Sequence, residues 1–82
     1  MSKHFFDKYS VEKWYYRSGQ LSCKIKRKND KLHGVEKRFF ENGQLRYKIK
    51  YKNGKLHGTE MEFDENGNVI KRHFYENGLM KK

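Results

Sequence analysis

Residues 35–58 read VEKRFFENGQLRYKIKYKNGKLHG, and a related sequence of the same length stands on either side of them. Residues 11–34 read VEKWYYRSGQLSCKIKRKNDKLHG, and residues 59–82 read TEMEFDENGNVIKRHFYENGLMKK. The three copies align without a gap. Repetition at a fixed short period is typical of proteins in which each copy is one structural unit that packs on the next. The sequence therefore predicts three repeats, over 11–34, 35–58 and 59–82, preceded by an N-terminal cap segment over 1–10.

Every copy contains two turn signals. The first series is Ser18-Gly19, Asn42-Gly43 and Asn66-Gly67, and the second is Asn29-Asp30, Asn53-Gly54 and Asn77-Gly78. Asn-Gly between alternating segments is a strong hairpin signal, because both residues tolerate the positive φ that such turns require. Asp30 stands where the other copies have glycine. Aspartate enters the left-handed region more readily than most residues, so we expect its turn to form.

The segments between the turns have the length and the alternation of β-strands, and none shows helical periodicity. We expect strands near residues 12–17, 20–28, 34–40, 44–52, 58–64 and 68–75. They predict an all-β fold of tandem antiparallel β-hairpin repeats, with a 24-residue period, that form a single elongated twisted meander sheet. Phe5, Phe6 and Tyr9 are expected to cover the first hairpin, either as a short helix or as an additional strand.

Positive charge dominates the composition. The 82 residues include 20 Lys and Arg against 10 Asp and Glu, a formal net charge of +10, and charged residues (37%) outnumber hydrophobic ones (34%). Such a chain attracts anionic partners, whether acidic proteins, nucleic acids or anionic lipid headgroups. The lone Cys23 excludes an intrachain disulfide. Because no apolar leader or membrane span is evident either, we expect a soluble protein of the reducing cytoplasm.

Strand alternation predicts two different faces. In the first two copies the apolar residues alternate with Lys and Arg, so one face should be apolar and the other cationic. The apolar set is Leu21, Cys23, Ile25, Leu45, Tyr47, Ile49 and Tyr51. Glu12, Glu36 and Glu60 recur at one position and are expected to pair with lysines across strands. Three glutamates cannot neutralise so many cations, which indicates a surface for an anionic partner; the alternative is a face that serves solubility and edge protection.

The aromatic doublets Tyr15-Tyr16 and Phe39-Phe40 should each place one ring on either side of the sheet, since neighbouring strand residues point to opposite faces. The exposed rings then either bind a partner beside the lysines or stiffen a single-layer sheet by stacking. The predicted partner-binding residues are Trp14, Tyr16, Lys24, Lys26, Lys28, Arg38, Phe40, Arg46, Lys48, Lys50 and Lys52.

The third copy keeps the turns but loses much of this surface. Asp64 replaces the second aromatic residue, and Lys71 and His73 stand where the second copy has Tyr47 and Ile49. A terminal repeat requires a polar outer surface. The third copy is therefore expected to be a cap, with binding confined to residues 14–56.

No catalytic residue, cofactor or metal is predicted, and the protein is expected not to be an enzyme. His33 and His57 each precede a glycine, one repeat apart. A zinc site needs three or four ligands at closer spacing, so a packing and hydrogen-bonding role at the strand entry is favoured. Cys23 lies in the apolar set and is expected to be buried and unreactive.

The stretches Phe40-Glu-Asn-Gly-Gln-Leu45 and Tyr51-Lys-Asn-Gly-Lys-Leu-His-Gly58 resemble the variant MORN repeat. Over roughly residues 13–82 the chain is similar to the bacterial YwqK-type antitoxins. The resemblance implies a β-hairpin repeat fold and a non-enzymatic role as an antitoxin, immunity partner or scaffold, and for classical MORN proteins the binding of anionic lipids. Asp30 departs from the usual glycine, and residues 79–82 depart from Lys-Leu-His-Gly, which suggests that the array ends there.

The leading hypothesis is a protein-binding module: an antitoxin, immunity protein or inhibitor. It would mask an acidic or nucleic-acid-processing partner, a toxin or effector enzyme, with its basic and aromatic face. The first alternative is direct binding of nucleic acid, for which lysine rows interleaved with aromatic rings are a platform. The second is attachment to an anionic membrane. Pairing of exposed edge strands is a further route to an oligomer.

Overall fold

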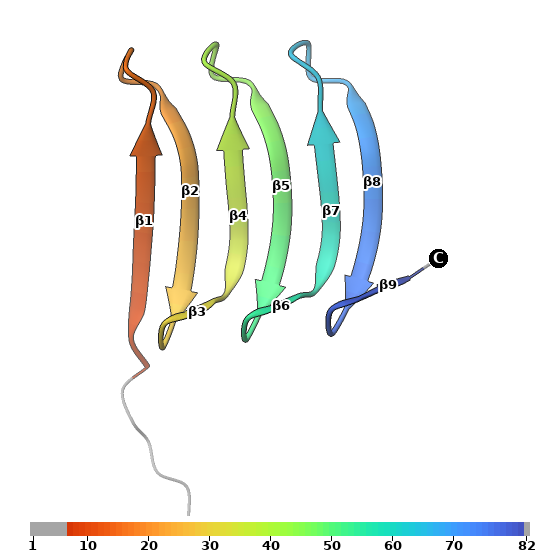
Figure 1. Cartoon of the computed structure of the whole chain (residues 1–82). Coiled ribbons are helices and arrows are strands. Elements are labelled where there is room, and N and C mark those ends of the chain that lie inside the picture. The colour runs from red at the N-terminus through yellow and green to blue at the C-terminus, as the bar shows by residue number, and fades with distance from the viewer. Residues whose placement is uncertain (1–6, 82) are drawn as a thin grey trace, which may run out of the picture.

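The computed structural model describes residues 7–81, which form one antiparallel sheet (Figure 1). The long strands are β1 (Tyr9–Tyr15), β2 (Leu21–Lys28), β4 (Gly34–Phe39), β5 (Leu45–Lys52), β7 (Gly58–Phe63) and β8 (Val69–Glu76). The short strands are β3 (Lys31–Leu32), β6 (Lys55–Leu56) and β9 (Leu79–Lys81). Each long strand pairs with the next one along the chain, so the predicted meander of hairpin repeats is confirmed.

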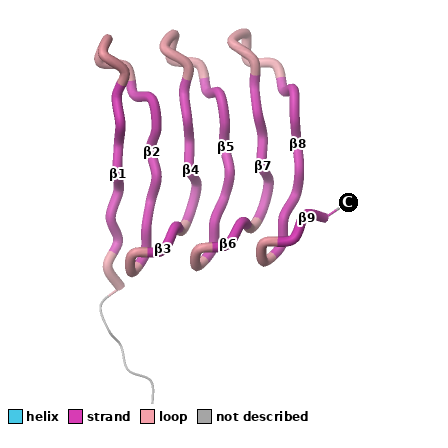
Figure 2. The backbone as a smooth tube through the Cα atoms, in the orientation of Figure 1, coloured by secondary structure: helices cyan, strands magenta, loops and turns pink. Residues whose placement is uncertain are grey.

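The sheet is a single layer. None of the described residues is helical, and the shortest extent of the Cα trace is 11 Å. Figure 2 shows the long strands standing side by side, with turns alternating between the two ends of the sheet. Within the described part of the chain no helix is long and apolar enough to cross a membrane.

The first series of turns is built on glycine alone. Gly43 has a φ of 92°, whereas Asn42 keeps a negative φ. The Gly43 amide donates to the Phe40 carbonyl at 2.9 Å, and the Phe40 amide donates to the Gln44 carbonyl at 2.8 Å. The glycine thus follows an ordinary turn instead of sharing a mirror-image turn with the residue before it. The expectation of positive φ at both residues is wrong for this series.

The second series has the expected conformation. Asn53 and Gly54 have φ values of 50° and 86°, and the pairs Asn29-Asp30 and Asn77-Gly78 match them. Two consecutive residues with positive φ define the tight turn that suits the twist of the flanking strands. Asp30, with a φ of 68°, forms this turn as predicted.

A β-bulge interrupts each long hairpin. Arg38 pairs with Tyr47 but Phe39 pairs with Leu45, so Arg46 is an additional residue on β5. The same shift leaves Ser22 and Ile70 as additional residues on β2 and β8. A bulge bends its strand and redirects the side chain of the additional residue. Simple alternation therefore fails at these three positions.

The N-terminal segment joins the first repeat. Strand β1 begins at Tyr9, so Tyr9 and Ser10 belong to the sheet. The backbone amide of Asn29 donates to the Lys8 carbonyl at 2.7 Å, and the Lys8 amide donates to Asn29 Oδ1 at 3.0 Å. The expectations for Phe5 and Phe6 lie outside the described residues.

The core is small. Among the described residues only Ile25 (7% exposed), Ile49 (1%) and Glu36 (6%) are buried. Ile25 and Ile49 occupy the same position in successive copies, and Glu36 is about as inaccessible as Ile25. The face that was expected to be apolar is therefore built around a buried carboxylate.

Hydrogen bonds link each repeat to the next. The amides of Gly54 and Gly78 donate to the carbonyls of Leu32 and Leu56, both at 2.8 Å. His33 Nδ1 accepts from the Asn53 amide at 3.3 Å, and His57 Nδ1 accepts from the Asn77 amide at 3.4 Å. The structural role predicted for these two histidines is confirmed, since each supports the turn of the following copy.

Replacing Asp30 by glycine is expected to raise the free energy of unfolding by up to about 1 kcal/mol. Left-handed strain costs an ordinary residue about 1–2 kcal/mol, which exceeds the roughly 0.5–1 kcal/mol of entropy that glycine adds to the unfolded chain. The reciprocal change Gly54→Asp should lower stability by a similar amount, because a Cβ at Gly54 would make only ordinary contact with the Lys31 side chain and its φ alone resists a side chain. Urea unfolding of both variants checks this, and equal effects of the same sign would contradict it.

Candidate functional site

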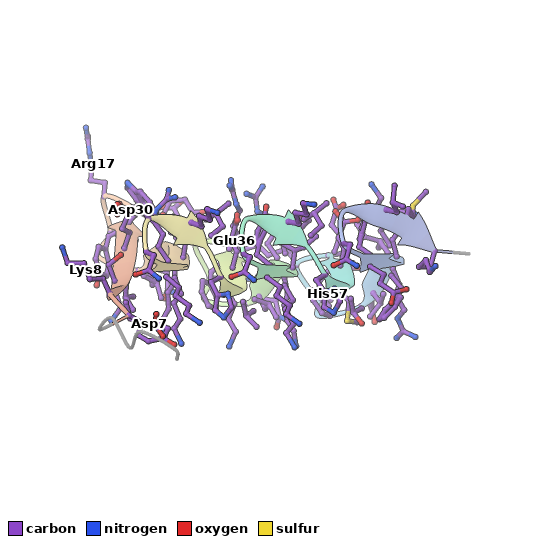
Figure 3. All side chains as sticks on the ribbon, turned by 90° about the horizontal axis from the view of Figure 1, so that it is seen from below. Asp7, Lys8, Arg17, Asp30, Glu36 and His57 are labelled. Carbon is purple, nitrogen blue, oxygen red and sulfur yellow. The ribbon has the colours of Figure 1, made fainter. Side chains whose placement is uncertain are left out.

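Pairing register divides the strand side chains between two faces, since residues directly opposite each other point the same way. Figure 3 shows side chains standing on both sides of the sheet. We call one side the cationic face: Tyr9, Val11, Lys13, Lys24, Lys26, Lys28, Val35, Lys37, Lys48, Lys50, Lys52, Thr59, Met61, Arg72 and Phe74. The other is the glutamate face: Glu12, Trp14, Cys23, Ile25, Glu36, Arg38, Tyr47, Ile49, Tyr51, Glu60, Glu62, His73 and Tyr75.

A row of cations, interrupted once by Met61, crosses the cationic face. Lys24 lies opposite Lys13 on one side and Lys37 on the other, and Lys37 lies opposite Lys48. Beyond Lys48 the row continues through Met61 to a final arginine. We call Lys13, Lys24, Lys37, Lys48 and Arg72 the cationic row. With strands about 4.8 Å apart it spans about 24 Å.

Within the described part of the chain, no carboxylate lies within 4.0 Å of any member of this row. The repeat glutamates lie on the other face, because their register partners are Ile25, Ile49 and His73. There Glu12 pairs with Arg27 at 3.0 Å and Glu36 with Arg38 at 2.7 Å. The expectation that these glutamates pair with lysines across strands is wrong.

Apolar and aromatic groups border the cationic row. Lys26 lies opposite Val11, Lys50 lies opposite Val35, and the Lys26 ammonium sits 5.1 Å from the centroid of the Tyr9 ring. Tyr9 and Val11 are exposed. The face therefore offers lysine ammonium groups together with small apolar surfaces, a mixture that suits an amphipathic partner.

The glycine after each repeat histidine makes room for a lysine stem. A Cβ placed on Gly58 would stand 3.2 Å from Cδ of Lys50, and one on Gly34 would stand 3.4 Å from Cδ of Lys26. A side chain at either glycine would therefore crowd the lysine stem that packs against it.

The structure divides the predicted binding residues into three groups. The lysines lie on the cationic face: Lys24, Lys26, Lys28, Lys48, Lys50 and Lys52. Trp14 and Arg38 lie on the glutamate face, and the bulge brings Arg46 to the same side, where it lines a pocket with Glu36 and Arg38. Tyr16 and Phe40 lie in turns, and the Tyr16 hydroxyl donates to the Phe39 carbonyl at 2.7 Å. None of the predicted aromatic residues therefore lies among the lysines, and the ring that does is that of Tyr9.

Three members of the cationic row were missed. Lys13 and Lys37 occupy one repeat position on the first strand of each hairpin, and Arg72 lies on the last long strand. Alternation along the segments that begin at Val11 and Val35 would have found Lys13 and Lys37. Each of these lysines stands next to a repeat glutamate and so points to the opposite face.

Carboxylates on the glutamate face are held by several donors. Glu60 Oε2 accepts from the Tyr47 hydroxyl at 2.7 Å, and its Oε1 lies 3.2 Å from both the Tyr75 hydroxyl and His73 Nδ1. The Tyr47 hydrogen bond is the largest of the effects that lower the pKa of Glu60. Burial chiefly raises the pKa of Tyr47 and of Tyr51, so both hydroxyls stay protonated, and that of Tyr47 donates to Glu60.

The thiol of Cys23 is half-buried, so full burial was the wrong expectation. Burial is nevertheless the largest influence on its pKa, which it raises. Because the thiolate is the reactive form, a raised pKa favours the unreactive thiol that was predicted.

The third copy is less polar than expected. Val69, Ile70, Phe74, Leu79 and Met80 are all exposed, so this end of the sheet is not a polar cap.

Asp64 in the third copy has a local role. Its Oδ1 accepts from the amides of Asn66 and Asn68, both at 2.9 Å, which fixes the turn where the other copies use an aromatic residue. These backbone hydrogen bonds, with that from Asn68 first, hold the pKa of Asp64 below its usual value.

The chemistry that the described residues support is anion binding. Among them no group of three His, Cys, Asp or Glu side chains is placed to hold a metal ion. The histidines at 33 and 57 are engaged at turns, and His73 is engaged with Glu60. The cationic row is the largest charged feature that the fold's own contacts leave free.

Comparison with known families agrees with this architecture. The family described as MORN repeat variant matches residues 9–29, 32–53 and 56–77, so the chain belongs to that family. Each match ends at a turn of the second series, and each contains one long hairpin. No curated protein and no solved structure matches the chain. MORN repeats are non-catalytic modules that bind proteins or phospholipids.

Lys37→Glu is expected to raise the free energy of unfolding by roughly 0.5–1 kcal/mol at low salt, because Lys37 lies between Lys24 and Lys48 and like charges directly opposite destabilise a sheet. The gain should shrink with added salt. Urea unfolding at two ionic strengths measures it. Arg17→Glu, in an exposed turn, makes the same charge change and should leave stability nearly unchanged; an equal gain there would mean that net charge alone is responsible.

Glu60→Gln is expected to lower the free energy of unfolding at pH 7 by about 2 kcal/mol, the usual worth of hydrogen bonds to a charged group. Because the pKa of Glu60 is lowered on folding, its contribution is complete above the usual value of 4.5 and disappears as the pH falls through the lower folded value. The difference between wild type and variant should therefore shrink below pH 4.5. Glu62→Gln is the matched control on the same face of β7, and a pH-independent difference for Glu60→Gln would refute the assignment.

Proposed function

We propose that this MORN repeat variant protein binds an acidic partner protein through its cationic face. The observation that supports the proposal is the cationic row, in which four lysines lie opposite one another on consecutive long strands without a nearby carboxylate. Adjacent like charges lower the stability of a sheet. Lysines that are kept at repeat positions despite this cost therefore serve a function other than stability, and the binding of an anionic partner is such a function.

A protein suits this face better than a nucleic acid. Single-stranded nucleic acid is held by aromatic rings that stack on the bases. Here Trp14 and Tyr47 lie on the opposite face, and Tyr16 is engaged in a turn. The groups that border the lysines along the face are Val11, Val35 and Met61, and its aromatic rings, Tyr9 and Phe74, lie only on its first and last long strands. Aliphatic surface between ammonium groups complements an acidic protein surface that carries its own apolar side chains.

The partner class that we propose is a toxin or effector enzyme, and the role is that of an antitoxin, immunity protein or inhibitor in the cytoplasm. The resemblance to YwqK-type antitoxins motivates this class. Occlusion by a flat face needs no catalytic residue in the inhibitor, since coverage of a functional surface is sufficient. A stoichiometric complex with the product of an adjacent gene, lost on mutation of the cationic row, is the result expected in the native cell.

A second candidate is an anionic membrane surface. Tyr9, Val11 and Phe74 are exposed at the two ends of the cationic face, where they are placed to enter a lipid interface while the lysines contact headgroups. Each lysine near such a surface contributes about 1 kcal/mol. The two candidate functions predict different ligands: an acidic polypeptide for the protein partner, and a vesicle with anionic headgroups for the membrane.

The test uses a variant with Lys24, Lys37 and Lys48 replaced by glutamine. Its affinity for poly-glutamate, measured by calorimetry at low salt, is expected to fall about tenfold, since each exposed ion pair contributes about 0.2–1 kcal/mol. Single-stranded DNA and vesicles with and without phosphatidylserine are measured in parallel. Preference for poly-glutamate supports the acidic protein, and preference for the phosphatidylserine vesicles supports the membrane.

The matched control replaces Lys8, Arg17 and Lys71 by glutamine. These exposed residues lie before β1, in a turn and on the glutamate face opposite Glu62, so the control loses the same charge and leaves the cationic face intact. Its affinity should stay within about twofold of wild type. Equal losses in both triple variants would show that net charge alone drives binding, and the proposal would fail.

A further inference from the structure

We propose a second binding site on the glutamate face, where Arg38 and Arg46 receive a carboxylate from an extended acidic peptide segment. This site does not rest on the proposed function, since it shares no residue with the cationic row. It is centred on the second copy, between β4 and β5. We call the open pocket lined by Glu36, Arg38, Arg46, Tyr47, Tyr51 and Glu62 the arginine pocket.

The two arginines are not needed by the repeat fold. The position of Arg38 is held by Trp14 in the first copy and Glu62 in the third. The position of Arg46 is held by Ser22 and Ile70, and all three form the same bulge. Because the same backbone forms with serine and isoleucine, the guanidinium of Arg46 serves no requirement of the bulge itself.

The bulge is what brings the two guanidinium groups to one pocket. Ordinary alternation would send Arg46 to the cationic face beside Lys48. As the additional residue on β5 it instead lines the arginine pocket with Arg38 and Tyr47. The positive charges of Arg38 and Arg46 also both act on the nearby thiol of Cys23, whose pKa they lower against the larger effect of burial.

Both guanidinium groups have donors to spare. Arg38 uses Nε to donate to Glu36 Oε2 at 2.7 Å, and its Nη groups have no partner among the described residues. Arg46 has no ion pair or hydrogen bond to any residue that the structure describes. Guanidinium groups present planar pairs of N–H donors that match a carboxylate. The buried Glu36, 7% exposed at its side chain, fixes the orientation of Arg38 in advance.

The other groups in the pocket define the ligand more closely. Glu62 also lines it and lacks an ion-pair partner among the described residues, so a singly charged carboxylate is favoured over a doubly charged phosphate. The Tyr47 hydroxyl is engaged with Glu60, and Tyr51 also lines the pocket. Their rings are left as apolar walls, which suit the methylene groups of an acidic side chain.

A second depression adjoins the arginine pocket and shares Glu36, Arg38 and Tyr51 with it. Trp14, Cys23, Ile25 and Leu32 form its apolar part, and Ser22 and Arg27 complete its lining. Trp14 is 48% exposed although it is the largest aromatic residue of the chain. The depression is centred on β2, about one and a half strand spacings from the arginines, or roughly 7 Å. Side chains two residues apart in an extended segment have that separation, so the ligand carries an apolar residue two positions from an acidic one.

The test is an NMR titration of the full chain with the acetylated, amidated pentapeptide Ser-Phe-Ser-Glu-Ser. Shifts are expected at the Nε–H signals of Arg38 and Arg46 and at the indole N–H of Trp14. The same peptide with glutamine in place of glutamate should bind at least about tenfold more weakly, because a charge-assisted hydrogen bond contributes about 1.5–3 kcal/mol. Replacing its phenylalanine by alanine should remove the Trp14 shift.

Arg46→Gln is the decisive variant. We expect it to fold, because the same bulge forms with Ser22 in the first copy and with Ile70 in the third. It should weaken binding of the glutamate peptide at least about tenfold. Arg17→Gln removes the same charge from an exposed turn (Figure 3) and should leave binding unchanged. Equal losses in both variants, equal binding of the glutamine peptide, shifts confined to the cationic face, or no shift at millimolar peptide would each overturn the site.

Discussion

A sheet with no second layer cannot bury its side chains against another sheet or a helix, and this constraint shapes the whole molecule. Side chains on a bare sheet are covered only by their neighbours on the same face. Ile49 is fully covered in this way, between the β4 and β7 strands that carry Glu36 and Glu60. Continuing the observed register, isoleucine and glutamate alternate from strand to strand. Long, branched and hydrogen-bonded side chains close over one another and exclude water where no second layer exists.

A buried carboxylate is tolerated only when its oxygens are satisfied, because desolvation of an unpaired charge costs several kcal/mol. Glu36 is satisfied by Arg38, and Glu60 by Tyr47, Tyr75 and His73. Tyr47 belongs to the copy before Glu60, so the polar contacts also couple neighbouring copies. They hold Glu36 and Glu60 on one face. Among the described residues the cationic row on the other face has no ion-pair partner, so the network that stabilises the sheet also leaves the cationic row free.

The regular features of the fold follow from the sequence because they depend on local chemistry. Turn residues such as Asn53-Gly54 prefer one backbone conformation, and alternation then fixes which residues share a face. The faces of Glu12, Glu36 and Glu60 were misjudged because charge complementarity with the lysines was weighed above alternation within their own strands. The face on which Arg46 lies could not be predicted from alternation. A bulge adds one residue to the strand and so changes which face that residue points to, and no residue type in this stretch marks the bulge. The exposed apolar residues of β8 and β9 were missed because Lys71 and His73 suggested a polar cap, whereas burial depends on neighbouring long strands, and among the described residues only the short β9 pairs with the outer edge of β8.

The two candidate surfaces differ in how the repeat produces them. The cationic row is built mainly from positions that recur: Lys13 with Lys37, and Lys24 with Lys48. A surface of this kind lengthens with every added copy, so its affinity for an extended anionic partner grows with repeat number while its selectivity stays low. The arginine pocket is built from residues that occur in one copy only. A repeat protein gains selectivity where one copy departs from the others without disturbing the shared backbone, and Arg46 at a bulge that also accepts serine and isoleucine meets that condition. The cationic row and the arginine pocket lie on opposite faces of one sheet. Attraction of anionic partners by the row and selection among them by the pocket can therefore be changed independently in this chain.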